Sequence, residues 1–170
     1  GDFSTPNFVY IKDASSVQVV DLNGDGRLDI LGGGSEIFWI ECQGNGSFSD
    51  PVILSLEGRK SVGVTDLNND GVLDIFYGGG RVVWHEGYSD GSFSKAREIS
   101  SSGAQSVQVA DLNRDGNPDV LYGGDGVYWH ENQDGRFLSA QQLSSESEVT
   151  EVGTADLNGD GRKDVFFSHY

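Results

Sequence analysis

The sequence predicts an all-β fold, a β-propeller-type array of four repeats that each hold four strands. Three observations predict it. A nine-residue phrase rich in Asp returns four times at a constant spacing, strand-like alternation precedes the copies, and 25 of the 170 residues are glycine. That much glycine favours tight turns over long helices. A repeat of about 45 residues is the length of a four-stranded propeller blade.

The repeated phrase sets the organisation of the chain. It reads DLNGDGRLD, DLNNDGVLD, DLNRDGNPD and DLNGDGRKD, and its copies begin at Asp21, Asp66, Asp111 and Asp156, each 45 residues after the one before. Two further residue types keep the same step, namely Trp39, Trp84 and Trp129 together with Glu41, Glu86 and Glu131. We therefore predict one domain, residues 1–170, with repeats centred on loops 21–29, 66–74, 111–119 and 156–164.

The strands of one repeat follow in a fixed order. In the first repeat Val17 and Val19 alternate with polar neighbours, a period of two that marks a strand before the acidic phrase. After the phrase come a short apolar run, Ile30-Leu31, and then a glycine turn. A third strand carries the tryptophan, and a second turn leads to a fourth strand with Phe48. One such sheet cannot bury both faces alone, so the sheets must stack on one another.

The two ends of the sequence predict an incomplete fourth repeat. Residues 1–11 match the fourth strand of a repeat, and residues 149–170 supply only its first two strands. We expect the last blade to be incomplete or shared between the termini. Two alternatives stay open: the chain lacks flanking blades of a longer propeller, or copies of the chain complete each other as a homo-oligomer.

Charge and composition exclude several classes of partner. Lys and Arg total 11 against 27 Asp and Glu, a formal net charge of −16, which repels a phosphate backbone and argues against nucleic acid. No apolar run approaches the roughly 20 residues that span a membrane, so no membrane insertion is expected. Cys42 is the single cysteine, which excludes an intrachain disulfide and a Cys-rich zinc site.

The phrase D-x-N-x-D-G-x-x-D has the logic of a calcium loop. Ca²⁺ takes about six to eight oxygen ligands, and residues 1, 3 and 5 of a tightly curled loop aim their side chains at one centre. Gly at position 6 allows the sharp turn, position 7 offers its backbone carbonyl, and Asp at position 9 closes the site. The predicted ligands, for one ion per loop and four in all, are Asp21, Asn23, Asp25, Arg27, Asp29, Asp66, Asn68, Asp70, Val72, Asp74, Asp111, Asn113, Asp115, Asn117, Asp119, Asp156, Asn158, Asp160, Arg162 and Asp164.

Other interpretations of the phrase are weaker. An EF-hand needs a bidentate Glu at position 12, where this chain has Gly32, Tyr77, Tyr122 or Phe167. Mg²⁺ retains several waters and demands octahedral geometry, and Zn²⁺ favours His or Cys. Plain solvated turns would explain one copy more easily than four copies at one spacing. Three carboxylates packed into one loop also repel each other without a cation.

The remaining recurrent side chains are interpreted structurally. The tryptophans could stack on sugars, but their strict repetition favours one core slot in each blade, with the indole N–H bonded. The recurrent Glu is expected to pair with a neighbouring blade or to accept hydrogen bonds from a turn. His85 and His130 are duplicated, unlike a catalytic His, and are interpreted as blade-surface residues. The position-2 leucines are expected to turn inward and tie each loop to the core; they are Leu22, Leu67, Leu112 and Leu157.

Two segments carry a resemblance to a known family. The segments VQVADLNRDGNPDV, from Val107 to Val120, and WHENQDGRF, from Trp129 to Phe137, resemble FG-GAP or VCBS-type repeats, which also form integrin α-subunit propellers. The resemblance covers nearly the whole chain. It implies a β-propeller with calcium, mostly structural, in loops between the first and second strands of each blade. Many members are extracellular, among them adhesion receptors, fungal lectins and non-catalytic parts of secreted enzymes. This chain has fewer blades than the usual seven, which leaves ring closure open.

These observations predict a calcium-stabilised, non-enzymatic, secreted recognition module. Neither a Ser-His-Asp nor a Cys-His arrangement stands out, and a carboxylate that binds calcium is a poor general acid. A glycan is the expected ligand, bound lectin-like through repeated blade surfaces, because repeated weak sites add through effective concentration. The alternatives are a protein-binding adhesion scaffold of the integrin type and a non-catalytic propeller part of a larger secreted enzyme. The sequence assigns no ligand-binding residue.

Overall fold

The computed structural model describes residues 11, 13–56 and 61–170 and shows an all-β protein. The predicted strand over residues 1–11 lies outside the described residues, apart from Ile11. Within the described part, every regular element is a strand and every strand pair is antiparallel. The predicted fold class is confirmed.

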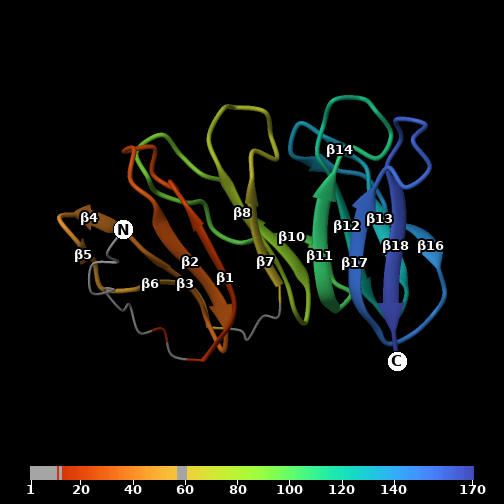
Figure 1. Ribbon diagram of the computed structural model, residues 1–170, viewed down its shortest axis with the longest axis horizontal. Coiled ribbons are helices and arrows are strands. Elements are labelled where there is room, and N and C mark those ends of the chain that lie inside the picture. Colours follow the sequence, from red (N-terminus) through yellow and green to blue (C-terminus); the bar gives the residue numbers. More distant parts are fainter. Residues whose placement is uncertain (1–10, 12, 57–60) are drawn as a thin grey trace, which may run out of the picture.

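Four sheets follow one another along the chain, and we call them blades 1 to 4 (Figure 1). Blade 1 consists of β1 (Ala14–Val20), β2 (Asp29–Gly34), β3 (Ile37–Ile40) and β6 (Val52–Ser55). Blade 2 consists of β7 (Ser61–Thr65), β8 (Asp74–Gly78), β9 (Val82–His85) and β10 (Arg97–Ser100). Blade 3 consists of β11 (Ala104–Ala110), β12 (Asp119–Gly124), β13 (Val127–His130) and β16 (Gln141–Ser144). Blade 4 consists of β17 (Val149–Ala155) and β18 (Asp164–His169).

Two small ribbons interrupt the run between the third and fourth strands of a blade. They are β4 (Cys42–Gly44) with β5 (Ser47–Phe48), and β14 (Asn132–Gln133) with β15 (Arg136–Phe137). In blade 2 the same place holds a single bridge between Gly87 and Phe93. The phenylalanine assigned to the fourth strand therefore lies in this ribbon, and the fourth strand proper begins a few residues later.

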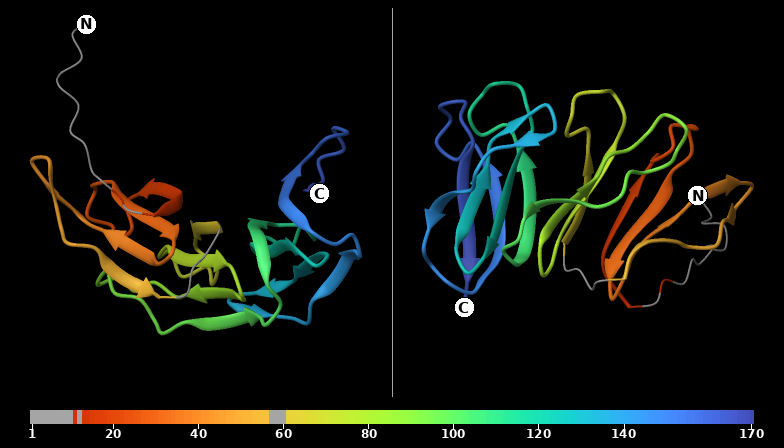
Figure 2. Two further views of the ribbon diagram at one scale, coloured as in Figure 1. Left: turned by 90° about the horizontal axis from the view of Figure 1, so that it is seen from below. Right: turned by 180° about the vertical axis from the view of Figure 1, so that it is seen from behind.

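The blades stand face to face in chain order along an open arc (Figure 2). Blade 1 and blade 4 lie at opposite ends of it (Figure 1), and no described strand of one pairs with a described strand of the other. We call the face of a blade that packs on the next blade its leading face, and the opposite face its trailing face.

The hydrophobic core lies between the blades. The junction of blades 1 and 2 buries Leu22, Leu31 and Ile37 against Val62 and Tyr77. Corresponding clusters fill the junctions of blades 2 and 3 and of blades 3 and 4. The alternation of strand side chains thus supplies one leading face and one trailing face per sheet, and stacking buries both.

The position-2 leucines show how much this packing depends on the next blade. Leu22 and Leu67 are buried, and Leu112 is partly buried against the junction of blades 3 and 4. Leu157 is exposed, so the expectation that it turns into a core is wrong. The reason is that each of these leucines belongs to a leading face, and no described blade covers the leading face of blade 4.

The recurrent tryptophans fill equivalent positions of the junctions. Trp39 meets Phe93 of the next blade edge-on, with ring centroids 5.9 Å apart, and Trp84 meets Phe137 at the same distance. The interpretation as core residues is confirmed for Trp84, whereas Trp39 and Trp129 are only partly buried. The expected indole hydrogen bond is absent at Trp39, because its Nε1 is buried and finds no partner in the part of the chain that the structure describes.

Candidate functional site

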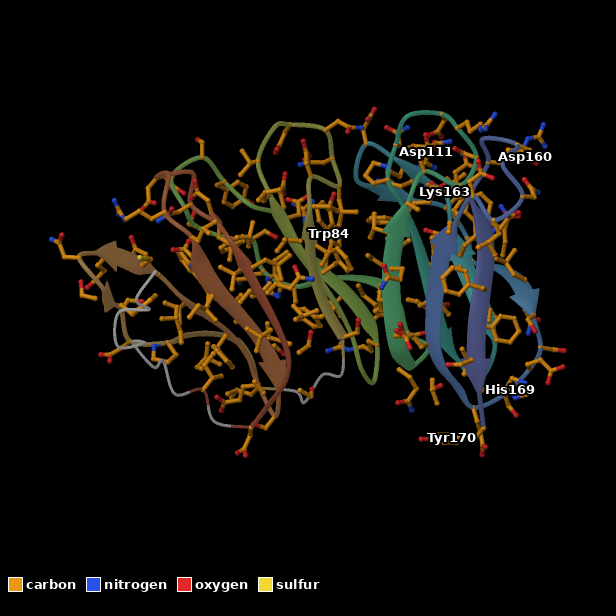
Figure 3. All side chains as sticks on the ribbon, in the orientation of Figure 1. Trp84, Asp111, Asp160, Lys163, His169 and Tyr170 are labelled. Carbon is orange, nitrogen blue, oxygen red and sulfur yellow. The ribbon has the colours of Figure 1, made fainter. Side chains whose placement is uncertain are left out.

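Each acidic phrase forms a loop between the first and second strands of its blade, as the sequence predicts. Asp111 of the third loop and Asp160 of the fourth lie at one end of the molecule, and His169 and Tyr170 lie at the other (Figure 3). The antiparallel pairing of the two flanking strands brings the ends of each loop together. The loops therefore form a row of acidic turns along one edge of the arc.

Position 1 organises each loop by accepting backbone hydrogen bonds. In the second loop Oδ1 of Asp66 accepts from the N–H of Asp70 at 3.1 Å, and its Oδ2 accepts from the N–H of Gly71 at 2.8 Å. The other three loops repeat this pattern. Gly71 has a φ of 86°, a left-handed conformation that side chains disfavour, which explains the glycine at position 6.

Position 5 accepts from position 7 in every loop. Oδ1 of Asp70 accepts from the N–H of Val72 at 2.8 Å, and the same bond forms in the other loops. This use of the backbone N–H explains why the side chain at position 7 varies freely. The role of its carbonyl as a metal ligand stays a prediction. In the first loop the guanidinium of Arg27 also contacts Asp25 and donates to the carbonyl of Cys42 at 2.7 Å.

The position-9 aspartate is the most enclosed group of the loop. Oδ2 of Asp74 accepts from the N–H of Leu67, and its Oδ1 accepts from the N–H of Gly87, both at 2.8 Å. Asp74 is fully buried, as are its counterparts Asp29 and Asp119, which accept the equivalent bonds. This carboxylate ties the start of the loop to the segment after the third strand. That structural role was missed by the sequence analysis.

The carboxylates of one loop lie in different electrostatic surroundings. Burial raises the pKa of Asp74 to about 6, against the two backbone hydrogen bonds that lower it, and the nearby Asp70 and Asp66 raise it further. Burial also raises the pKa of Asp119. The backbone N–H of Asn117 and the side-chain amide of Asn113 lower the pKa of Asp115, which lies at position 5. In the third loop the pKa of Asp119 at position 9 is thus raised, whereas the pKa of Asp115 at position 5 is lowered.

The position-3 asparagine is held by the recurrent glutamate in two blades. Nδ2 of Asn23 donates to Oε1 of Glu41 at 3.2 Å, and Nδ2 of Asn68 donates to Oε1 of Glu86 at the same distance. The amide oxygens turn back into the loop, where Oδ1 of Asn68 accepts from the N–H of Asp70. In blade 3 the glutamate, Glu131, instead accepts from the side chain of Gln133. The 45-residue recurrence of this Glu was the signal for its role.

The chemical type of the donor atoms in the acidic loops fits a hard cation. Positions 1, 3, 5 and 9 supply only carboxylate and amide oxygens, and a carboxylate oxygen that accepts one N–H keeps a second acceptor site. The side chains at these positions face the backbone N–H groups of their own loops. Within residues 11, 13–56 and 61–170, no group of three or more His, Cys, Asp or Glu is gathered as a metal cluster.

A cleft opens between blades 1 and 2, next to the buried Nε1 of Trp39. It has a volume of about 490 Å³ and is lined by Trp39 and Ile53 of blade 1 and by His85, Phe93 and Lys95 of blade 2, among others. A second cleft of about 390 Å³ lies at the junction of blades 3 and 4, lined by Trp129, Asn113 and Lys163. Each combines an aromatic wall with a few polar groups, as small-molecule sites do.

Trp84 shows a different arrangement at the junction between these two. The guanidinium of Arg97 lies over its ring, 5.2 Å from the centroid, and pairs with Glu86 at 2.5 Å. Trp84 is almost fully buried, whereas Trp39 and Trp129 are only partly buried. Trp84 is therefore covered by its cation–π contact with Arg97.

The two recurrent histidines are buried, so their assignment to the blade surface is wrong. Nδ1 of His85 lies 2.8 Å from the carbonyl oxygen of Ser94, and its Nε2 lies 3.0 Å from the hydroxyl of Tyr77. Nδ1 of His130 bonds to the carbonyl oxygen of Leu138 at 2.7 Å, while its Nε2 is buried without a partner among the described residues. The segment before the fourth strand folds over each ring, a contact that local periodicity does not reveal.

One further feature bears on location. In the part of the chain that the structure describes, no helix is long and apolar enough to cross a membrane.

Comparisons with known proteins agree with the 45-residue repeat found in the sequence. A family model described as FG-GAP-like repeat matches three overlapping stretches, residues 21–77, 66–122 and 111–167. No curated protein matches the chain. Among solved structures, a lectin of Agrocybe aegerita, described by its specific recognition of non-reducing terminal N-acetylglucosamine, matches with a TM-score of 0.62 and 22% identity. The match covers 92% of this chain and 47% of the lectin chain, so this chain spans about half of that structure.

Proposed function

This chain belongs to the FG-GAP-like repeat family, and we propose that it is a calcium-stabilised extracellular recognition module whose inter-blade clefts bind glycans. The observation that carries the glycan proposal is the cleft beside Trp39, where a partly exposed indole ring adjoins polar groups. Pyranose rings offer C–H faces to an aromatic wall and hydroxyl groups to polar side chains.

Calcium is the cation proposed for the acidic loops. It is supported by an all-oxygen donor set in four loops of one geometry and by the glutamates that hold the position-3 amides. Calcium would neutralise the close carboxylates and cross-link each loop. The cleft beside Trp39 is lined by no residue of an acidic loop, so there the metal acts on recognition through the stability of the blades, whereas Asn113 and Lys163 bring the third and fourth loops to the wall of the second cleft.

The fold similarity to a lectin is consistent with a recognition role, although at 22% identity it speaks for the fold alone. The proposal assigns the chain no reaction. An extracellular place accords with the loops, because millimolar calcium outside cells fills even weak sites.

A glycan array probed with this chain in calcium tests the proposal, with N-acetylglucosamine-terminated glycans among the sugars. The Trp39→Phe variant removes the indole N–H and about a third of the ring surface on which a sugar would stack, so it should lose most of the signal. The matched Trp84→Phe variant should keep it, because Arg97 already covers that ring. A silent array with folded, calcium-loaded protein would refute glycan binding and favour a protein-binding scaffold or an accessory propeller of a larger enzyme.

A further inference from the structure

Among residues 11, 13–56 and 61–170, two apolar faces of the blade array are left uncovered. On the leading face of blade 4, Leu157 is 68% exposed and Phe166 is 48% exposed. On the trailing face of blade 1, Val17 is 49% exposed and Val19 is 60% exposed. Their counterparts inside the array are covered: Leu67 is 0% exposed, and Val107, the counterpart of Val17, is 2% exposed. Side chains of the same type at the same positions thus differ only in whether a neighbouring blade lies over them.

The blades alternate between two kinds of leading face. In blade 2 the ring of Phe76 lies over Gly63, so closely that a Cβ there would come within 2.2 Å of it. Blade 4 repeats this pair, with Phe166 over Gly153 at 2.5 Å. Blades 1 and 3 carry Gln and Leu at the two positions instead, as Gln18 with Leu31 and Gln108 with Leu121. Blade 4 therefore has the same kind of leading face as blade 2, with a phenylalanine ring over a glycine.

The trailing face of blade 1 repeats part of the trailing face of blade 3. Blade 1 carries Ala14, Val17 and Val19 where blade 3 carries Ala104, Val107 and Val109. Inside the array, the leading face of blade 2 packs on the trailing face of blade 3 through Leu67 and Phe76 on one side and Val107 and Val109 on the other. The two uncovered faces therefore carry the same Leu–Phe and Val–Val contact positions as that junction, and they differ from it at Gly32, which stands where blade 3 has Tyr122.

Polar groups at the rim of the face fit the same pairing. At the internal junctions a serine hydroxyl of one blade bonds to the backbone of the next: Ser61 Oγ accepts from the N–H of Val107 at 3.3 Å, and Ser106 Oγ accepts from the N–H of Val152 at 3.3 Å. Glu151 is the counterpart of these serines in blade 4 and is exposed. Its carboxylate is an acceptor suited to the N–H of Val17, the counterpart of Val107 and Val152.

We propose that the leading face of blade 4 binds the trailing face of blade 1 of a second copy of this chain, head to tail. Within one copy these faces lie at opposite ends of the arc (Figure 2). Leu157 is position 2 of the fourth acidic loop, whereas Val17 lies outside the acidic loops and the two clefts, so the two faces are tested separately.

Sedimentation velocity of the purified chain, over a range of concentrations in calcium, tests the proposal. A concentration-dependent species of twice the mass of one chain, or a longer head-to-tail assembly, is expected. Leu157→Asp and Val17→Asp should each weaken association at least about tenfold, because each buries a charge in an apolar junction. Glu151→Lys is a milder, exposed change that should weaken it as well. Leu56→Asp, at an exposed leucine off both faces, should associate like the wild type.

Mixing the variants distinguishes head-to-tail contact from other dimers. Leu157→Asp keeps an intact trailing face, and Val17→Asp keeps an intact leading face. Each should be monomeric alone, and the mixture should recover one association step, with circular dichroism showing that both are folded. A monomer at every concentration would overturn the proposal. So would an oligomer that ignores both variants, or one that responds to only one of the two faces.

Discussion

Oε1 of Glu86 accepts a hydrogen bond from Nδ2 of Asn68 at 3.2 Å, and the same Nδ2 donates to Oδ2 of Asp70 at 2.9 Å. An asparagine can present either its oxygen or its nitrogen to a neighbouring cation, and only the oxygen binds one. When a cation takes the Asp70 carboxylate, Glu86 remains as a partner for the nitrogen and leaves the oxygen to the loop. Partners that orient a metal ligand in this way typically contribute about 10- to 100-fold in affinity.

Glu86→Ala should therefore weaken calcium binding at the second loop by about tenfold or more. The loss of the pair with Arg97 affects the fold in calcium and in chelator alike, so the difference between the two conditions isolates the metal. Calorimetric titration of calcium measures it. Glu131→Ala is the matched control, because Glu131 bonds to Gln133 and should leave affinity unchanged. Equal effects of the two substitutions would contradict the positioning role.

Removal of calcium should lower the melting temperature by roughly 10 °C or more. A site at 100 times its dissociation constant contributes about 2.7 kcal/mol, and each kcal/mol shifts the melting temperature of a chain of this size by about 2–4 °C. Differential scanning calorimetry in calcium and in EDTA checks this, with elemental analysis for the ion count. An unchanged melt with no bound metal would refute the calcium proposal.

Asp70→Ala should abolish one ion while the other loops stay loaded. The destabilisation should be visible in calcium and nearly absent in EDTA, because Asp70 is exposed and makes only local contacts in its loop. Glu146→Ala removes an equal charge from an exposed position outside the loops and serves as the control. Destabilisation of Asp70→Ala that is the same in both conditions would mean that the carboxylate is a turn residue and no metal ligand.

Asp74→Ala should behave differently, because Asp74 is a structural clamp as well as a predicted ligand. The substitution leaves the buried N–H groups of Leu67 and Gly87 without their acceptor, at a cost of about 1–3 kcal/mol for each. Denaturant unfolding should show this loss in EDTA as well as in calcium. A variant as stable as the wild type in EDTA would show that water replaces the carboxylate at no cost.

The pH dependence of the stability of the metal-free protein should report the protonation of Asp74. The pKa of Asp74 is raised to about 6 in the folded state from 3.8, so the folded state binds its proton more tightly than the unfolded chain. The stabilising contribution is complete below pH 3.8 and is lost as pH rises through 6. In EDTA, the stability advantage of the wild type over Asp74→Ala should therefore shrink between pH 4 and pH 7, by at most about 3 kcal/mol. An advantage that grows with pH would contradict the assignment.

The 45-residue period predicted the blades and the position of every acidic loop, because identical loops must lie between equivalent strands. It did not predict contacts that depend on segments folding back. His85 was assigned to the surface because it is duplicated as His130, unlike a catalytic histidine, yet the carbonyl of Ser94 closes over it. Asp74 was interpreted as a ligand alone, although its bond to Gly87 reaches across 13 residues. Leu157 has the sequence context of Leu67 and differs only in the neighbouring blade.

The alternation between Gly–Phe and Gln–Leu leading faces gives a last prediction. Gly63→Ala places a methyl group where the ring of Phe76 lies, and Phe76 is locked in the junction of blades 2 and 3. Overpacking of this kind costs about 1–3 kcal/mol. The double variant Gly63→Ala with Phe76→Leu should recover part of that loss, because leucine is the residue that blades 1 and 3 use beside a longer side chain. Urea unfolding of the wild type, both single variants and the double variant measures the coupling. Simple additivity of the two single effects would show that the ring and the glycine are independent.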